Sequence, residues 1–143
     1  MEFNDEGLIK PGIHECDINE LYETFVGNFK TSQRRDIIFK SLIEFLQQLI
    51  SHYNLEEVWI DGSYVTNKIN PNDVDIVLFF EVSDYIRLIQ QWETIRNVIN
   101  IDSYCEAIVN EDSRNKLSPE EYVFINNRRN YWRGQFGFDR TDT

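Results

Sequence analysis

The apolar run VDIVLFF, from Val74 to Phe80, is the sequence feature that most constrains the fold. Apart from Asp75 it contains no polar residue, so it lacks the alternation of a strand that has one side facing solvent. A run of this length, rich in Val, Ile and Phe, is typical of a strand whose two faces are both covered. We therefore expect a sheet with packed layers on each side.

Helix-type and strand-type segments alternate along the rest of the chain, which favours an α/β (α+β) fold. We expect a mixed sheet flanked by helices, although the pattern does not reveal strand directions. Further strands are predicted at 58–60 and 99–109. Helices are predicted to begin near Asp17, near Thr31 or Ser32, and near Ser83. A fourth begins at Ser118-Pro119-Glu120-Glu121, which has a cap, an N1 proline and a capping-box glutamate in order.

Length and composition place the chain among single globular domains. With 143 residues and 41% hydrophobic side chains, it is predicted to fold as one domain over 1–143, with an N-terminal arm at 1–16 and a frayed tail at 139–143. No apolar run approaches a membrane span, and the acidic start MEFNDEG does not resemble a signal peptide. A cytoplasmic location, with Cys16 and Cys105 reduced, is therefore expected.

The net charge of −11 restricts the partners. Binding along a nucleic-acid duplex requires Lys and Arg to neutralise phosphates, so a duplex is not an expected partner. A nucleotide that arrives with its metal ions, or a basic protein, fits this charge better.

Two aspartates lie at the start of the apolar run. On an extended chain Asp73 and Asp75 point to the same face, and neighbouring carboxylates repel each other unless a cation lies between them. Mg²⁺ suits such a place, because it is commonly held by one or two carboxylates and substrate phosphates. A site for two ions needs a third carboxylate from a neighbouring strand. Asp102 is the first candidate; Glu106, about 13 Å farther along the strand, is the second.

A Gly-Ser pair follows the preceding apolar segment. Gly62 would let the backbone approach a triphosphate closely, and Ser63 would offer a hydroxyl and an N–H to phosphate oxygens. Lys68 is a candidate phosphate ligand or an exposed loop lysine. The segment 62–68 is not a P-loop, because no second glycine precedes Lys68. The segment 70–75 is not an EF-hand loop, because it lacks the central glycine and distal glutamate.

Together these residues resemble the signature of the DNA polymerase beta-type nucleotidyltransferase superfamily. That signature is an apolar residue, Gly and Ser, a short spacer, Asp-hydrophobic-Asp, and a third acidic residue on a later strand. The strings GSYVTNK and PNDVDI, with PGIH at 11–14 and YWRGQFGFDR at 131–140, are similar to a family of small, mostly uncharacterised bacterial proteins assigned to that superfamily. The similarity covers most of the chain.

The resemblance implies a minimal nucleotidyltransferase fold that binds two Mg²⁺ ions and a nucleoside triphosphate such as ATP. In that interpretation Asp73, Asp75 and Asp102 hold the metals, Asp102 also activates the acceptor hydroxyl, and Gly62 and Ser63 bind the phosphates. Small members of the superfamily include antitoxins that nucleotidylate a partner toxin, and others belong to phage-defence systems. A toxin-like partner protein is therefore one expected acceptor. The alternative is an inactive nucleotide-binding or protein-interaction module of the same fold.

Basic and aromatic residues gather near the C-terminus. Arg128, Arg129, Arg133 and Arg140 form either a solvated helix face or a contact with phosphate or a partner, and the sequence leaves both interpretations open. The aromatic residues Trp132, Phe136 and Phe138 are predicted to pack the terminal segment.

Overall fold

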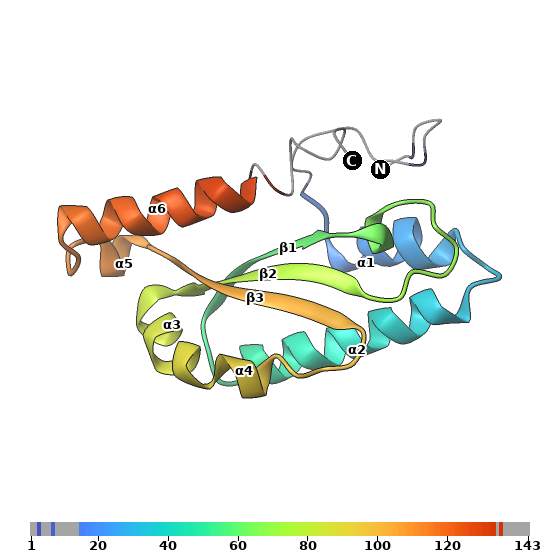
Figure 1. Ribbon diagram of the computed structural model, residues 1–143, viewed down its shortest axis with the longest axis horizontal. Coiled ribbons are helices and arrows are strands. Elements are labelled where there is room, and N and C mark those ends of the chain that lie inside the picture. Colours follow the sequence, from blue (N-terminus) through green and yellow to red (C-terminus); the bar gives the residue numbers. More distant parts are fainter. Residues whose placement is uncertain (1–2, 4–6, 8–14, 134, 136–143) are drawn as a thin grey trace.

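The computed structural model describes residues 3, 7, 15–133 and 135, which form a three-stranded sheet with helices on both faces (Figure 1). This arrangement confirms the predicted α/β class with a mixed sheet. The strands are β1 (Leu55–Asp61), β2 (Val74–Glu81) and β3 (Ile101–Ile108). The α-helices are α1 (Ile18–Tyr22), α2 (Gln33–Ile50), α3 (Val82–Leu88), α4 (Trp92–Ile95), α5 (Glu111–Arg114) and α6 (Pro119–Arg133). The π-helix η1 (Glu23–Gly27) and the 3-10 helices η2 (Ser63–Val65) and η3 (Ile89–Gln91) complete the elements.

β2 is the central strand of the sheet. It pairs with β1 in the antiparallel direction and with β3 in the parallel direction, in the order β1-β2-β3. The parallel connection passes through α3, η3 and α4, as a parallel pair requires a crossover between its strands.

One face of the sheet packs against α2. The alternating β2 residues Val74, Ile76, Leu78 and Phe80 are completely buried there, in one cluster with residues of α2 that recur at the helical period. These helix residues are Ile38, Leu42, Phe45 and Leu49. The buried residues of α2, spaced at the helical period, therefore pack against the buried residues of β2, spaced at the strand period, in the main core.

α6 covers part of the opposite face, and Figure 1 shows it on the other side of the sheet from α2. The remaining β2 residues Val77 and Phe79 are also completely buried, in a second cluster with Trp132 of α6. Both faces of β2 are therefore covered, which is why its apolar run shows so little alternation. The prediction that Trp132 packs the terminal segment is confirmed; Phe136 and Phe138 lie outside the described residues.

Three helix starts agree with the sequence. The Asp17 carboxylate accepts a hydrogen bond from the Glu20 N–H at 2.8 Å, and the Ser32 hydroxyl accepts one from the Arg35 N–H at 3.2 Å. At α6, Ser118 and Glu121 exchange side-chain and backbone hydrogen bonds of 3.0 and 3.1 Å, which is the predicted capping box.

The third predicted helix differs from expectation in two respects. Its N-cap is Glu81 rather than Ser83, because the Glu81 carboxylate accepts a charge-assisted hydrogen bond from the Ser83 N–H at 2.9 Å. The helix is also interrupted by η3, so that α3 and α4 are separate short helices.

No helix within the described part of the chain is both long and apolar enough to cross a membrane. Cys16 is exposed and Cys105 is buried, and both are free thiols. Burial raises the pKa of the Cys105 thiol well above its usual value, so this side chain is an uncharged member of the core.

Candidate active site

Strand pairing brings acidic side chains together at one end of the sheet. Asp75 is the register partner of Asp61 on β1 and of Asp102 on β3. Register partners on neighbouring strands point to the same face, so these three aspartates lie side by side, with Asp73 just before β2. Asp61 was missed by the sequence reasoning, although its position directly before Gly62 was an available signal.

Asp75, the central aspartate of this group, has a raised pKa. Burial, and then the nearby charges of Asp73 and Asp102, raise the pKa of Asp75 from an ordinary value of 3.8 to about 6. The influence of Asp73 and Asp102 on this carboxyl shows that all three groups share one electrostatic environment. A carboxyl whose pKa is raised in this way is typical of a site that receives a cation or a proton.

The raised pKa predicts that Asp75→Asn stabilises the protein at neutral pH. Because the folded form binds the Asp75 proton more tightly than the unfolded form does, folding loses stability as the pH rises from about 4 to about 6. The side chain is partly exposed and screened, so we expect a gain of about 1 kcal/mol at pH 7.5. Urea unfolding of both proteins measures it, and the gain should shrink toward pH 4. A variant that is less stable than the wild type at pH 7.5 would contradict the expectation.

Asp102 already has partners. Its Oδ1 accepts a hydrogen bond from Arg96 Nη2 at 2.9 Å, and its Oδ2 accepts one from the Tyr104 hydroxyl at 3.2 Å. The Arg96 guanidinium also lies 3.6 Å from the carboxylate of Glu93. Asp102 is therefore next to Asp75 in register but is already paired with Arg96.

Among residues 15–133, no three carboxylate, imidazole or thiol groups form a set that could hold a metal ion. Two carboxylates at Asp73 and Asp75 nevertheless suit Mg²⁺, which takes its other ligands from substrate phosphates and water. The raised pKa of Asp75 fits this donor set, because a bound cation would offset the burial and the neighbouring negative charges that raise it.

Gly62 places backbone directly against Asp75. Its φ of 84° and ψ of −169° lie in a region that residues with a side chain rarely adopt. A Cβ at this position would lie 2.5 Å from Asp75 Oδ2. A glycine is thus required at position 62 because the Asp75 carboxylate lies so close to it. The sequence had suggested a different reason, the close approach of a phosphate.

The loop after Gly62 is held by its own hydrogen bonds. The Ser63 carbonyl accepts hydrogen bonds from the Thr66 hydroxyl at 2.7 Å and from the Thr66 N–H at 3.2 Å. Tyr64 and Val65 are buried, whereas Lys68 is exposed. This leaves Ser63 half-buried at the start of η2, next to the aspartates, and the phosphate roles of Ser63 and Lys68 stay predictions.

Arg35 fixes this loop and was not identified from the sequence. The side chain is completely buried on α2, and all five N–H groups of its guanidinium donate to backbone carbonyls. The acceptors are Phe25 (2.9 Å), Tyr64 (2.6 Å), Thr66 (2.6 Å) and Lys68 (2.5 and 3.0 Å). Burial lowers the pKa of Arg35 to about 10, so it remains charged at neutral pH.

Two basic residues of α6 bind acids of the sheet, a pairing that the sequence did not indicate. Arg128 donates to the buried carboxylate of Glu106 at 2.8 and 3.0 Å, and Arg129 donates to Glu57 at 2.9 Å. Glu106 therefore serves the α6 contact, four register pairs away from the Asp75 pair. Arg133 is exposed. Arg140 and the PGIH segment lie outside the described residues.

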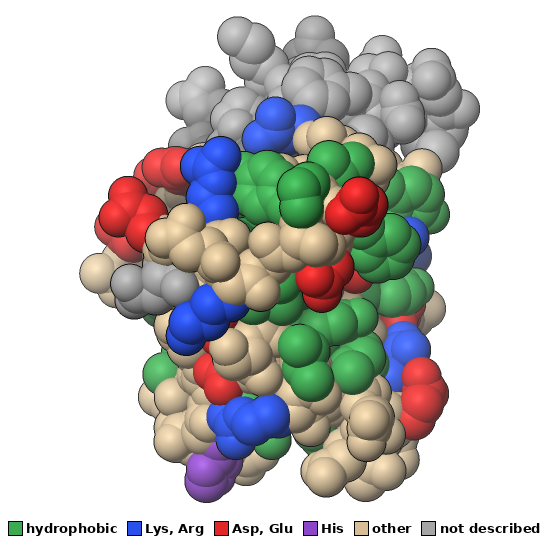
Figure 2. Space-filling view, turned by 90° about the vertical axis from the view of Figure 1, so that its left-hand side faces the viewer, with side chains coloured by type: hydrophobic (Ala, Val, Ile, Leu, Met, Phe, Trp, Pro, Cys, Tyr) green, Lys and Arg blue, Asp and Glu red, His purple; other side chains and the backbone are tan. Residues whose placement is uncertain are grey.

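The end of the molecule shown in Figure 2 carries no area of a single charge sign. Basic, acidic and hydrophobic side chains lie intermingled there.

The fold and the acidic group define an α/β protein with several carboxylates on one face of a mixed sheet, next to a glycine-initiated loop. The family is shown by sequence. The chain belongs to the family described as "Family of unknown function (DUF6932)", whose model matches residues 1–143. A search of curated proteins finds no match.

Among solved structures, the chain is similar to one described as the crystal structure of a "putative nucleotidyltransferase" from Sulfolobus solfataricus. The two share 19% sequence identity over 75% of this chain and 86% of that chain, with a TM-score of 0.37.

Proposed function

We propose that the protein is a Mg²⁺-dependent nucleotidyltransferase, which moves a nucleoside monophosphate from a nucleoside triphosphate to an acceptor hydroxyl. The observation that carries the proposal is the strand register that places Asp102 beside Asp75, with Asp73 two residues before Asp75 and Gly62 against its carboxylate. Carboxylates on adjacent strands next to a loop that permits close backbone approach are the parts that this chemistry needs.

Each residue has a role in this proposal. Asp73 and Asp75 hold Mg²⁺, which would bind the triphosphate and stabilise the charge that develops on its leaving group. Gly62 and Ser63 lie against the phosphates. Asp102 takes the proton of the acceptor hydroxyl, whose oxygen forms a bond to the α-phosphorus as pyrophosphate leaves.

The acceptor is proposed to belong to a partner protein, toxin-like in the interpretation that the superfamily resemblance suggests. The net charge of −11 supports a basic partner, because complementary charge accelerates and orients association. Mixing the protein with the product of an adjacent gene, Mg²⁺ and ATP, followed by intact mass measurement, tests this part. A partner that neither binds nor gains the mass of a nucleotide contradicts it.

Transfer itself is tested with nucleoside triphosphates labelled at the α-phosphate. The full chain is incubated with each of the four nucleotides, Mg²⁺ and cell extract, and labelled products are counted. We expect the double variant Asp73→Asn/Asp75→Asn to lose labelling by at least about 100-fold, because loss of the metal ligands removes several kcal/mol of charge stabilisation. The matched control is Asp36→Asn, which removes a half-buried aspartate paired with the exposed Lys40 on α2. Equal labelling by the double variant and the control would refute the assignment.

The ion pair between Arg96 and Asp102 favours a second candidate, a nucleotide-binding module that does not turn over. A carboxylate held in this pair is not available as a base. Calorimetry with Mg²⁺ and ATP, followed by a long incubation with extract, separates the two functions. Saturable binding without any labelled product supports the module, whereas product formation supports the enzyme.

A further inference from the structure

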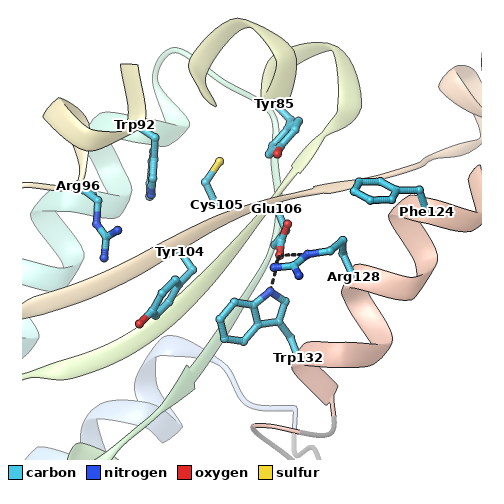
Figure 3. A pocket seen from close by; sticks show the side chains of 9 residues that line it. All are labelled: Tyr85, Trp92, Arg96, Tyr104, Cys105, Glu106, Phe124, Arg128 and Trp132. Atoms are coloured by element: carbon cyan, nitrogen blue, oxygen red, sulfur yellow. Dashed lines mark hydrogen bonds and ion pairs between the residues drawn. The ribbon is translucent and has the colours of Figure 1, made fainter. Parts of the chain in front are cut away.

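A second concave site lies along the outer edge of β3. A cavity of about 340 Å³ lies between this strand, the α3–α4 region and α6 (Figure 3). β3 is the edge strand of the described sheet, so side chains from both of its faces reach the cavity: Cys105 from one face, and Tyr104 and Glu106 from the other. Its size falls within the range of small-molecule sites, which begins at about 300 Å³.

Trp92 presents an unused hydrogen-bond donor to this cavity. Its side chain is 5% exposed, and its Nε1 has no hydrogen-bond partner among the described residues. Figure 3 shows the nitrogen edge of the indole turned toward the space between Arg96 and Cys105. A buried N–H without a partner is unfavourable, so a ligand that supplies an acceptor there would be favoured.

The charged groups of the cavity also favour a ligand with acceptors. Its carboxylate, Glu106, accepts hydrogen bonds from Arg128 and from the indole N–H of Trp132, all at the same oxygen, Oε2. Arg96 uses one nitrogen for Asp102 and approaches Glu93 with another, and a guanidinium has five N–H donors in total. The further N–H groups of Arg96 and the indole N–H of Trp92 are donors that match the negative group of an anion.

Aromatic rings define the shape of the ligand. The rings of Tyr104 and Trp132 lie side by side, with centroids 4.8 Å apart, and both line the cavity. Flat aromatic walls suit a planar ring, which packs against them by stacking or edge contact.

We propose that this cavity binds a small anion that carries a planar ring, with its negative group at Arg96 and an acceptor atom at Trp92 Nε1. Where this ligand is the molecule that receives the nucleotide, the proposal rests on the proposed function. Arg96 and Tyr104 line the cavity and also hold Asp102, so a bound anion would compete for Arg96 and release the carboxylate. Binding at the cavity would thereby complete the acidic group next to it.

The test uses the full chain labelled with ¹⁵N and needs neither Mg²⁺ nor a nucleotide. The chain has three tryptophans, so its spectrum contains three indole N–H signals, which are assigned by sequential NMR. The probe is indole-3-carboxylate, and the uncharged probe of the same shape is indole-3-carboxamide. We expect a saturable shift of the Trp92 signal with the carboxylate. The Trp59 signal should stay fixed, because its N–H is bonded to Glu57 on β1 at 3.0 Å and does not line the cavity.

Two variants locate the negative group of the probe. Arg96→Gln should weaken binding of indole-3-carboxylate about tenfold or more, because a hydrogen bond to a charged group is lost. Arg133→Gln removes an exposed arginine outside the cavity and should leave the affinity unchanged. Absence of any Trp92 shift, equal affinity for the carboxamide, or equal weakening by both variants overturns the proposal. Because this readout is independent of nucleotidyl transfer, failure here and failure of the proposed function are distinguishable.

Discussion

Arg35→Met is expected to destabilise the protein by about 3–5 kcal/mol, because it leaves buried carbonyl groups without donors. Five hydrogen bonds from one guanidinium join η1 and the loop after Gly62 to α2. Methionine fills a similar volume but donates none of them. Urea unfolding followed by circular dichroism measures the change in the free energy of unfolding.

The matched control is Arg34→Met, because Arg34 is the exposed neighbour of Arg35 on the same helix. It should change stability by no more than about 0.5 kcal/mol. Arg35→Lys separates charge from geometry. A single ammonium group cannot reproduce the planar fork of donors, so the lysine variant should recover only a small part of the loss. If Arg35→Met remains within about 1 kcal/mol of the wild type, the loop does not depend on this anchor.

Gly62→Ala is expected to cost about 2–3 kcal/mol of stability and to displace the Asp75 carboxylate. The backbone conformation, with φ at 84° and ψ at −169°, is unfavourable for alanine. The new methyl group would also lie 2.5 Å from Asp75 Oδ2. Thermal and urea unfolding report the loss. The NMR titration of the Asp75 carboxyl, whose pKa is raised to about 6, reports the displacement as a changed pKa.

A second glycine provides the control. A Cβ on Gly27 would meet no atom closer than 3.7 Å, and the backbone there is not in the left-handed region, so Gly27→Ala should be neutral or slightly stabilising. The double variant Gly62→Ala/Asp75→Ser keeps the backbone strain but shortens the opposing side chain. It should therefore cost less than the sum of its single variants. Strict additivity would show that Asp75 is not the group that the methyl meets.

Local signals predicted much of the fold because they act within a few residues. The caps at Asp17, Ser32 and Ser118 are short-range hydrogen bonds between neighbours in sequence, so the residue types alone indicate them. The third helix was harder to place, because Glu81 and Ser83 both offer a capping group and only the folded backbone selects one of them. The interruption at η3 has no comparable sequence signal.

The candidate site also contains some residues that the sequence predicts and others that only the folded structure reveals. Asp73 and Asp75 could be identified because their spacing matches the period of a strand. Asp102 was named as the third carboxylate because it lies on a neighbouring predicted strand, and the register places it beside Asp75. The role of Asp102 as a metal ligand or base stays a prediction, because in this structure its carboxylate is paired with Arg96. No local pattern identifies Arg96, because its partner lies on another element.

The sequence by itself determined that β2 is covered on both faces, because an apolar run without alternation cannot face water on either side. It also determined that two carboxylates open this strand. Only the tertiary structure decided which residues they meet. The pairing of Asp75 with Asp61 and Asp102, and the approach of Arg35 to the loop, join segments far apart in the chain. Such contacts depend on strand register and helix packing, which are set by the whole core rather than by any short stretch.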